Sequence, residues 1–205
     1  MTAVRSIVAA CGILGLIRPM QEAPMPLATP AVRAKYLISV ADDFVVDVYL
    51  NGKVIPDASR HLLDDRFGAT AERIDVTIRQ GDWLVFNVVN NRLRWDGARY
   101  FGVAGCIAKD EFSFVSDPAG RNWSACDEPT DVPDFISDSI FGAHRRALPV
   151  DHEWQDGTPL MKRYAGSSWN GKALWGESRN TWIKVHVQQG VTNWEVKRCG
   201  TGDSR

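Results

Sequence analysis

Three segments between residues 36 and 106 decide the fold: YLISVADDFVVDVYLNGKVIP (36–56), RIDVTIRQGDWLVFNVVNN (73–91) and RYFGVAGC (99–106). In the second segment the apolar residues Ile74, Val76 and Ile78 alternate with the polar residues Asp75 and Thr77. Successive side chains of a β-strand point to opposite faces, so this two-residue period indicates half-buried strands. An amphipathic helix would instead show a period of 3.6 residues. The pattern predicts a β-sandwich or jelly roll.

Turn signals and further alternating segments complete the predicted architecture. Asn51-Gly52 is typical of a two-residue hairpin, because both positions accept a positive φ. It should join 45–50 to 53–55. Residues 57–67 are read as one helical turn or a structured loop, and 134–144 as a short helix. The remaining predicted strands are 73–79, 83–89, 99–106, 111–115 (with Phe112 and Phe114 on one face), 181–188 and 193–199. The fold class is all-β, with a long Trp-rich insert at 116–176 and one short helix.

Length and composition favour one globular domain. The chain has 205 residues, of which 44% are hydrophobic and 24% are charged. This is enough to bury a core. The formal net charge is −1. That balance argues against a nucleic-acid partner, which needs a basic surface.

The first residues read as a leader, 1–31, ahead of a single β-sandwich domain, 32–205. Ser6 to Ile17 is uncharged and apolar, too short to span a bilayer but suited to a signal-peptide core. The stretch ending in Cys11 is the alternative, a bacterial lipoprotein box, and membrane attachment is expected only if Cys11 is lipidated. The prolines of this region disfavour a third reading, a buried hairpin. The predicted location is secreted, periplasmic or at the cell surface.

Export would leave three cysteines in the mature chain: Cys106, Cys126 and Cys199. We expect a disulfide between Cys106 and Cys126, closing a loop that leaves a strand end. Cys199 could pair with either of them instead. Their spacing does not suit a zinc cluster.

The segments ADDFVVDVYLNGKVIP and IDVTIRQGDWLVFNVVNN resemble galactose-binding-domain-like modules, the jelly rolls of lectins and carbohydrate-binding modules. The resemblance rests on Asp42-Asp43, Tyr49 to Gly52 and Gly81-Asp82, with Trp182 to Val187 suiting the last strand. It covers residues 36–89 well and the rest loosely. It implies a sandwich fold, and a glycan is one of several ligands that such modules bind.

Two stretches offer the chemistry that sugar binding needs, flat apolar rings beside hydrogen-bonding side chains. One is the loop around 90–100 and the other is 169–175. The candidate ligand-binding residues are Trp95, Tyr100, Trp169 and Trp175, with Arg94, Asp96 and Asn170 as polar partners. The competing interpretation is that these rings fold back over the end of the sandwich.

No cofactor is expected, with one exception: a structural calcium ion held by Asp42 and Asp43, since carboxylates at a strand bend suit that ion. Solvated acids at a turn are the simpler interpretation of the same pair. The acidic loop at 127–134 is the other option for such an ion.

Catalytic motifs are incomplete. His152-Glu153 begins like a zinc-protease helix, but Asp156 stands where the second His ligand is needed. Carboxylate pairs such as Glu153 with Asp156, or Asp151 with Glu177, keep a glycoside hydrolase or lyase as a third hypothesis. The first is a secreted, non-catalytic carbohydrate-binding module. The second is a structural or adhesion subunit that binds another protein in an envelope, matrix or particle.

Overall fold

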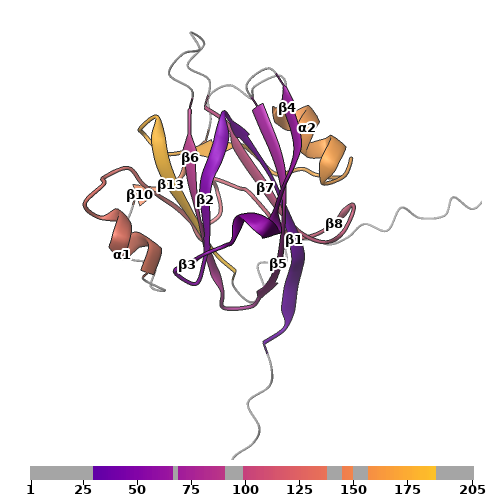
Figure 1. Cartoon of the computed structure of the whole chain (residues 1–205), viewed down its shortest axis with the longest axis horizontal. Coiled ribbons are helices and arrows are strands. Elements are labelled where there is room, and N and C mark those ends of the chain that lie inside the picture. Colours follow the sequence, from indigo (N-terminus) through magenta and orange to yellow (C-terminus); the bar gives the residue numbers. More distant parts are fainter. Residues whose placement is uncertain (1–29, 67–68, 91–98, 138–144, 150–156, 188–205) are drawn as a thin grey trace, which may run out of the picture.

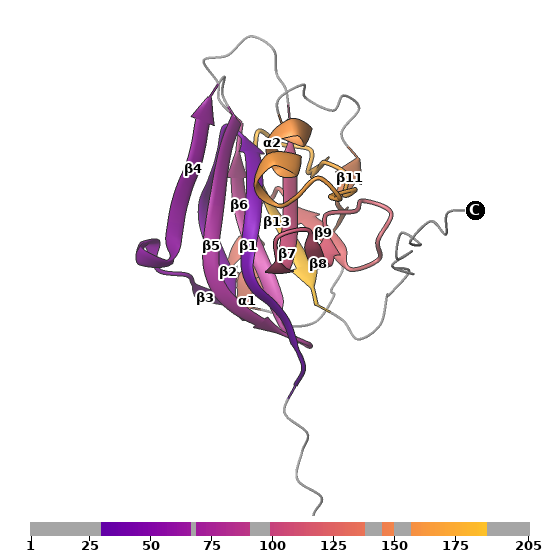
Figure 2. The same cartoon turned by 90° about the vertical axis from the view of Figure 1, so that its right-hand side faces the viewer.

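The structure, a computed structural model, describes residues 30–66, 69–90, 99–137, 145–149 and 157–187. Figures 1 and 2 show two packed layers of antiparallel sheet with a short helix on the outside of each. The elements in chain order are β1 (Val32–Asp42), β2 (Phe44–Leu50), β3 (Lys53–Val54), the 3-10 helix η1 (Asp57–Ser59), β4 (Arg60–Arg66), β5 (Ala69–Arg79), β6 (Trp83–Val89), β7 (Phe101–Ala108), β8 (Glu111–Val115), β9 (Trp123–Cys126), α1 (Val132–Ser137), β10 (Arg145–Arg146), β11 (Leu148–Pro149), α2 (Gly157–Tyr164), β12 (Leu174–Trp175) and β13 (Asn180–His186).

Five strands form one layer in the order β4-β5-β1-β7-β8, and six form the other in the order β10-β9-β13-β6-β2-β3. A short pair, β11 with β12, stands apart from both. The predicted β-sandwich is therefore confirmed at the level of two facing antiparallel sheets. No helix in the described part of the chain is long and apolar enough to span a bilayer.

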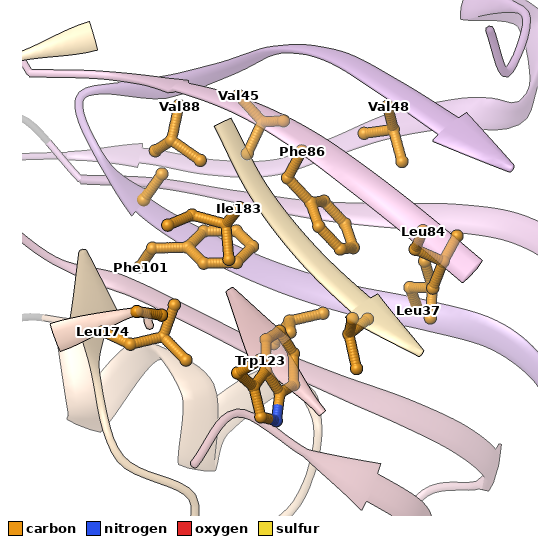
Figure 3. Packing of buried hydrophobic residues seen from close by; sticks show 14 of the residues in the cluster. Leu37, Val45, Val48, Leu84, Phe86, Val88, Phe101, Trp123, Leu174 and Ile183 are labelled. Atoms are coloured by element: carbon orange, nitrogen blue, oxygen red, sulfur yellow. The ribbon is translucent and has the colours of Figure 1, made fainter. Parts of the chain in front are cut away.

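The core lies between the sheets, where the alternating apolar residues of the sequence meet. Phe86 and Phe101 come from opposite sheets and their ring centroids are 5.0 Å apart. Figure 3 shows them packed with the aliphatic side chains around them and with Trp123. This burial is the main favourable contribution to folding, about 25 cal/mol for each Å² of apolar surface removed from water.

The predicted Asn51-Gly52 turn meets the turn before β6 at one end of the sandwich. Asn51 and Gly52 have φ angles of 51° and 77°, as the hairpin prediction requires. The Asn51 side chain donates a hydrogen bond to Asp82 (2.8 Å) and accepts one from the backbone N–H of Trp83 (3.0 Å). The β2–β3 hairpin is thereby tied to the turn before β6.

The helices cover the outer faces of the sheets. α2 packs on the five-stranded sheet, where Leu160 and Met161 contact the outward residues of β1, β5 and β7. On the other sheet, Phe135 of α1 lies over the buried Lys184, whose ammonium is 4.3 Å from the ring centroid. α1 begins at Val132, before the predicted start at 134.

Two local predictions differ from the structure. Residues 60–66 form β4, whereas a helical turn or loop was expected, and only η1 matches that expectation. Phe112 and Phe114 do not share a face, because the register shifts between Gly105 and Cys106. Phe112 therefore packs with the outer cluster and Phe114 with the core. A Cβ on Gly105 would lie 2.2 Å from the Phe114 ring, so glycine permits this inward turn.

Candidate binding surfaces

The three candidate aromatic residues that the structure describes lie inside the protein. Tyr100 is fully buried in the outer cluster of the five-stranded sheet, with its hydroxyl 3.3 Å from Thr158 Oγ1. Gly157 packs against its ring, where a Cβ would lie 2.7 Å away. No face of this ring is open to a sugar in this conformation.

Trp169 and Trp175 are each only 2% exposed. Trp169 belongs to the outer cluster with Tyr100, whereas Trp175 belongs to the core between the sheets. The Trp175 indole N–H donates to the carbonyl of Ser178 (2.7 Å). The two indoles therefore lie on opposite sides of the five-stranded sheet and form no shared platform. They pack inside the protein, as the competing interpretation expected. Asn170 between them is exposed.

Several other candidates fall outside the described residues: Arg94, Trp95 and Asp96 of the first loop, and Asp151, Glu153 and Asp156 of the carboxylate pairs. Glu177, the described member of those pairs, is exposed. Its backbone N–H donates to Asp127 (2.9 Å) and its carbonyl accepts from Arg99 (2.9 Å). These contacts fix the turn before β13.

Asp42 and Asp43, the candidate calcium ligands, lie at the junction of β1 and β2. The Asp42 carboxylate is buried and accepts a hydrogen bond from Asn90 Nδ2 (2.8 Å). The Asp43 carbonyl accepts a hydrogen bond from the Thr70 hydroxyl. Among the described residues no three acidic, histidine or cysteine side chains gather as a metal site would require. The contacts at this junction fasten the two sheets together.

The predicted disulfide between Cys106 and Cys126 is wrong, because both thiols are free and buried. Cys106 points outward from β7 into the cluster under α2, and Cys126 points outward from β9 into the cluster under α1. Facing sheets are about 10 Å apart, whereas disulfide-linked Cα atoms are usually about 5.5 Å apart. Burial raises the pKa of the Cys106 thiol to about 11, so it stays protonated at neutral pH.

The outer face of the five-stranded sheet has a part with exposed polar side chains. Asp75 of β5 and Tyr36 of β1 are register neighbours there, and Phe112 of β8 lies further along the same row. Arg73 stacks on Tyr36 at 4.3 Å and donates to Asp75 (2.7 Å), which also lies 3.2 Å from His61. The Arg73 hydrogen bond is the main cause that lowers the pKa of the Asp75 carboxyl. We call Tyr36, His61, Arg73 and Asp75 the polar row.

A second group of exposed side chains is apolar and comes from β2 and β3 of the six-stranded sheet and from β4, which is joined to β2 by the Arg60 hydrogen bonds. Six large apolar side chains are exposed among the described residues, and four of them are on these three strands. They are Phe44 (45% exposed), Val46 (38%), Val54 (56%) and Leu62 (65%), and we call them the apolar edge. Val32 and Leu148 are the other two.

Arg60 joins the two sheets beside the apolar edge. Its guanidinium makes two hydrogen bonds to Glu72 of β5 (2.7 and 3.0 Å) and donates to the carbonyls of Val45 (2.6 Å) and Val46 (2.7 Å). β3 pairs only with Tyr49 and Leu50 of β2, so the Arg60 bonds satisfy carbonyls of β2 that lie beyond this pairing. The apolar edge is thus held on a fixed frame.

Sequence reasoning missed Leu62 because it did not recognise β4. Alternation in R-H-L-L-D-D is interrupted at Leu62-Leu63, where the structure has a bulge. The available signal for a bulged edge strand was the polar pair on each side of this interruption, Arg60-His61 before it and Asp64-Asp65 after it.

Comparisons with protein-family models, with curated proteins and with solved structures give no match for this chain.

Proposed function

We propose that this chain is a non-catalytic β-sandwich module that binds another protein through its apolar edge, as a subunit of an envelope, matrix or particle. The observation that carries the proposal is the exposure of Phe44, Val46, Val54 and Leu62 on β2, β3 and β4, with Arg60 of β4 bonded to the carbonyl of Val46. Large apolar side chains that are exposed as a group in a soluble protein are typical of a surface that contacts a partner or ligand. The remaining large apolar residues described are mostly in the core or partly buried.

Rigidity supports the same proposal. The apolar edge is tied to both sheets through Arg60, so presenting it to a partner requires little reordering of backbone. The Leu62 side chain is exposed to water in the folded chain and adds nothing to the packing of the core.

The test is a photo-reactive amino acid placed at position 62 of the full chain, expressed in its native host. The matched control carries the same amino acid at position 148, where Leu148 is also exposed (44%) but lies on β11. We expect protein adducts from position 62 that position 148 does not give. Absence of any protein adduct specific to position 62 would refute the proposal.

The polar row favours a second candidate, carbohydrate binding by a lectin-like jelly roll. Arg73 offers planar donors, Asp75 offers acceptors and His61 offers either, which is the chemistry that recognises neighbouring sugar hydroxyls. His61 and Asp75 have side chains about half exposed (50% and 47%). This surface replaces the buried Tyr100, Trp169 and Trp175 as the place where a sugar would be sought.

A glycan array followed by calorimetry tests this second candidate. Asp75→Ala should abolish binding of any sugar that the array identifies, and Asn170→Ala should leave it unchanged, because Asn170 is exposed and belongs to the segment between α2 and β12 rather than to the strands of the row. Binding that survives Asp75→Ala, or an array without a hit, would exclude the polar row as a sugar site.

A further inference from the structure

One row of side chains on the outer face of the six-stranded sheet has the composition of a ligand site. The register places Asp47 of β2 opposite Asn87 of β6, and Asn87 opposite Trp182 of β13. Their chain neighbours Phe86 and Ile183 pack in the core between the sheets. Since successive side chains of a strand point to opposite faces, the three residues of the row point outward. We call Asp47, Asn87 and Trp182 the Trp182 row.

The helix on this face, α1, lies toward the other end of the sheet (Figure 1). It contacts the start of β6, where the Trp83 indole N–H donates to the Ile136 carbonyl (3.0 Å). Asn87 is four residues further along β6, a distance of about 13 Å along the strand. Trp182 touches the cluster under α1 with part of its surface, and Trp182 and Asp47 are both partly exposed.

The amide of Asn87 is the group that asks for a ligand. Asn87 is only 9% exposed, and within the described part of the chain its Oδ1 atom has no hydrogen-bond partner. Buried polar atoms are nearly always hydrogen-bonded, because leaving one unpaired lowers stability. An asparagine carries an acceptor and two donors, and a half-turn of the amide exchanges them. Asn87 can therefore accept from or donate to a hydroxyl group beside it.

The two neighbours of Asn87 indicate the chemical class of that ligand. Trp182 offers a flat apolar ring on one side, and Asp47 offers a carboxylate on the other. Adjacent strands are about 4.8 Å apart, so a ring that rests on Trp182 lies within reach of Asn87. The row thus combines an apolar surface with hydrogen-bonding groups at its side.

The charges around the row favour an uncharged ligand. The negative charge of Asp47 acts on Arg60 and on Tyr49, whose pKa is raised first by burial and then by this carboxylate. Lys184, the next outward position of β13, is buried with its ammonium over Phe135. Two positive groups thus offset the one carboxylate. Neither a cation nor an anion would gain much here from charge, whereas several hydroxyl groups can use every part of the row.

We infer that the Trp182 row binds a neutral sugar residue, which stacks on Trp182 and hydrogen-bonds to Asn87 and Asp47. The inference rests on the second candidate function, carbohydrate binding, and gives it a site on the sheet opposite to the polar row. It does not depend on the apolar edge. The two sugar sites lie on different sheets, so single substitutions tell them apart.

The first experiment uses the full chain on an array of neutral and acidic glycans, followed by calorimetry with the strongest neutral glycan. Trp182→Ala should lose binding, and Asp47→Asn should weaken it roughly tenfold, since it removes the charged acceptor. Asp75→Ala in the polar row should bind as wild type does. Binding that survives Trp182→Ala, or an array that responds only to acidic glycans, would overturn the inference.

The second experiment separates a ligand role of Asn87 from a structural one. Asn87→Leu keeps the size of the side chain and removes an amide that has no partner in the described chain, so its melting temperature should equal or exceed that of wild type. Its affinity for the same glycan should fall roughly tenfold. Asn170→Leu, an exposed asparagine off the row, is the matched control and should keep full affinity. A clear fall in the melting temperature of Asn87→Leu, or unchanged affinity, would overturn the assignment.

The remaining outcomes distinguish this site from the functions proposed above. If Asp75→Ala abolishes binding and Trp182→Ala does not, the Trp182 row fails and carbohydrate binding stands at the polar row. If the array gives no hit, both sugar sites fail. Protein adducts at position 62 would then still support the apolar edge.

Discussion

The two edges of the five-stranded sheet are finished in different ways. At β8 the chain returns to close the edge: the Ser168 N–H and hydroxyl donate to the Asp110 carboxylate (3.0 and 3.1 Å), and the Lys172 N–H donates to the Ser116 carbonyl (2.8 Å). At β4 the described chain adds no further strand, and Leu62 is left exposed. The Trp-rich insert thus covers one edge, whereas at the other edge the described part of the chain leaves a large apolar side chain exposed.

The comparison also separates two uses of large apolar residues. Trp169, which precedes the closing contact of Lys172, is buried against the sheet, whereas Leu62 and Phe44 are exposed on the other side. The type of a residue does not show whether its side chain is buried or exposed. The path of the chain around the residue decides this.

The largest expected effect is on the closed side. Trp169→Ala should lower the free energy of unfolding by about 3–5 kcal/mol, as truncation of buried aromatic residues does. Urea unfolding at low protein concentration measures it. Trp169→Phe should lose much less, because the buried indole N–H has no hydrogen-bond partner to lose. A small loss for Trp169→Ala would mean that this tryptophan is exposed in solution, and would restore it as a sugar platform.

The next effect is on the open side. Arg60→Ala should cost about 2–3 kcal/mol, because it leaves Glu72 and the carbonyls of Val45 and Val46 without their charged donor. Arg60→Lys cannot make the paired bonds to Glu72 and should recover only part of the loss. Unfolding in urea checks both. An Arg60→Ala chain as stable as wild type would show that the frame under the apolar edge does not depend on this residue.

Local signals in the sequence predicted much of the sheet. The Asn51-Gly52 hairpin, the strand at 83–89 and the alternation of Ile74 and Ile78 are confirmed, because each depends only on neighbours along the chain. The bulge at Leu62-Leu63 broke the two-residue period and hid β4. A periodicity argument fails wherever one inserted residue reverses the faces that follow, as it also did between Phe112 and Phe114.

The candidate sites were harder to predict because they depend on contacts between distant segments. Whether Trp169 and Tyr100 face solvent is decided by α2 and by the loop after it, which cover the outer face of the sheet. The Cys106–Cys126 prediction failed for the same reason, since spacing along the chain does not show that the two residues lie on different sheets and point away from each other.

A smaller effect concerns the charge that closes the β8 edge. The backbone N–H of Ser168 is the main cause that lowers the pKa of the Asp110 carboxyl. A lowered folded-state pKa gives stability that is present above the unfolded pKa and is lost as the pH falls through the folded one. Asp110 has a φ of 63°, which Asn also accepts, so Asp110→Asn removes the charge and keeps the backbone and an acceptor.

Asp110→Asn should therefore lower the melting temperature modestly at pH 7, and the gap to wild type should close in acid, as the pH falls below the ordinary aspartate pKa of about 3.9 and the wild-type carboxyl gains its proton. Thermal melts at pH 7 and in acid measure this. A gap of the same size at both would show that the interaction does not depend on the charge.

The smallest expected effect is at Leu62. Leu62→Ser should change the free energy of unfolding of the monomer by no more than about 0.5 kcal/mol, as expected for an exposed site away from special contacts. Unfolding must be measured at a concentration where the chain is monomeric, since binding to a partner adds to apparent stability. A large loss in the monomer would mean that Leu62 packs within its own chain. The open edge would then be closed like the other, and the difference between the two edges would vanish.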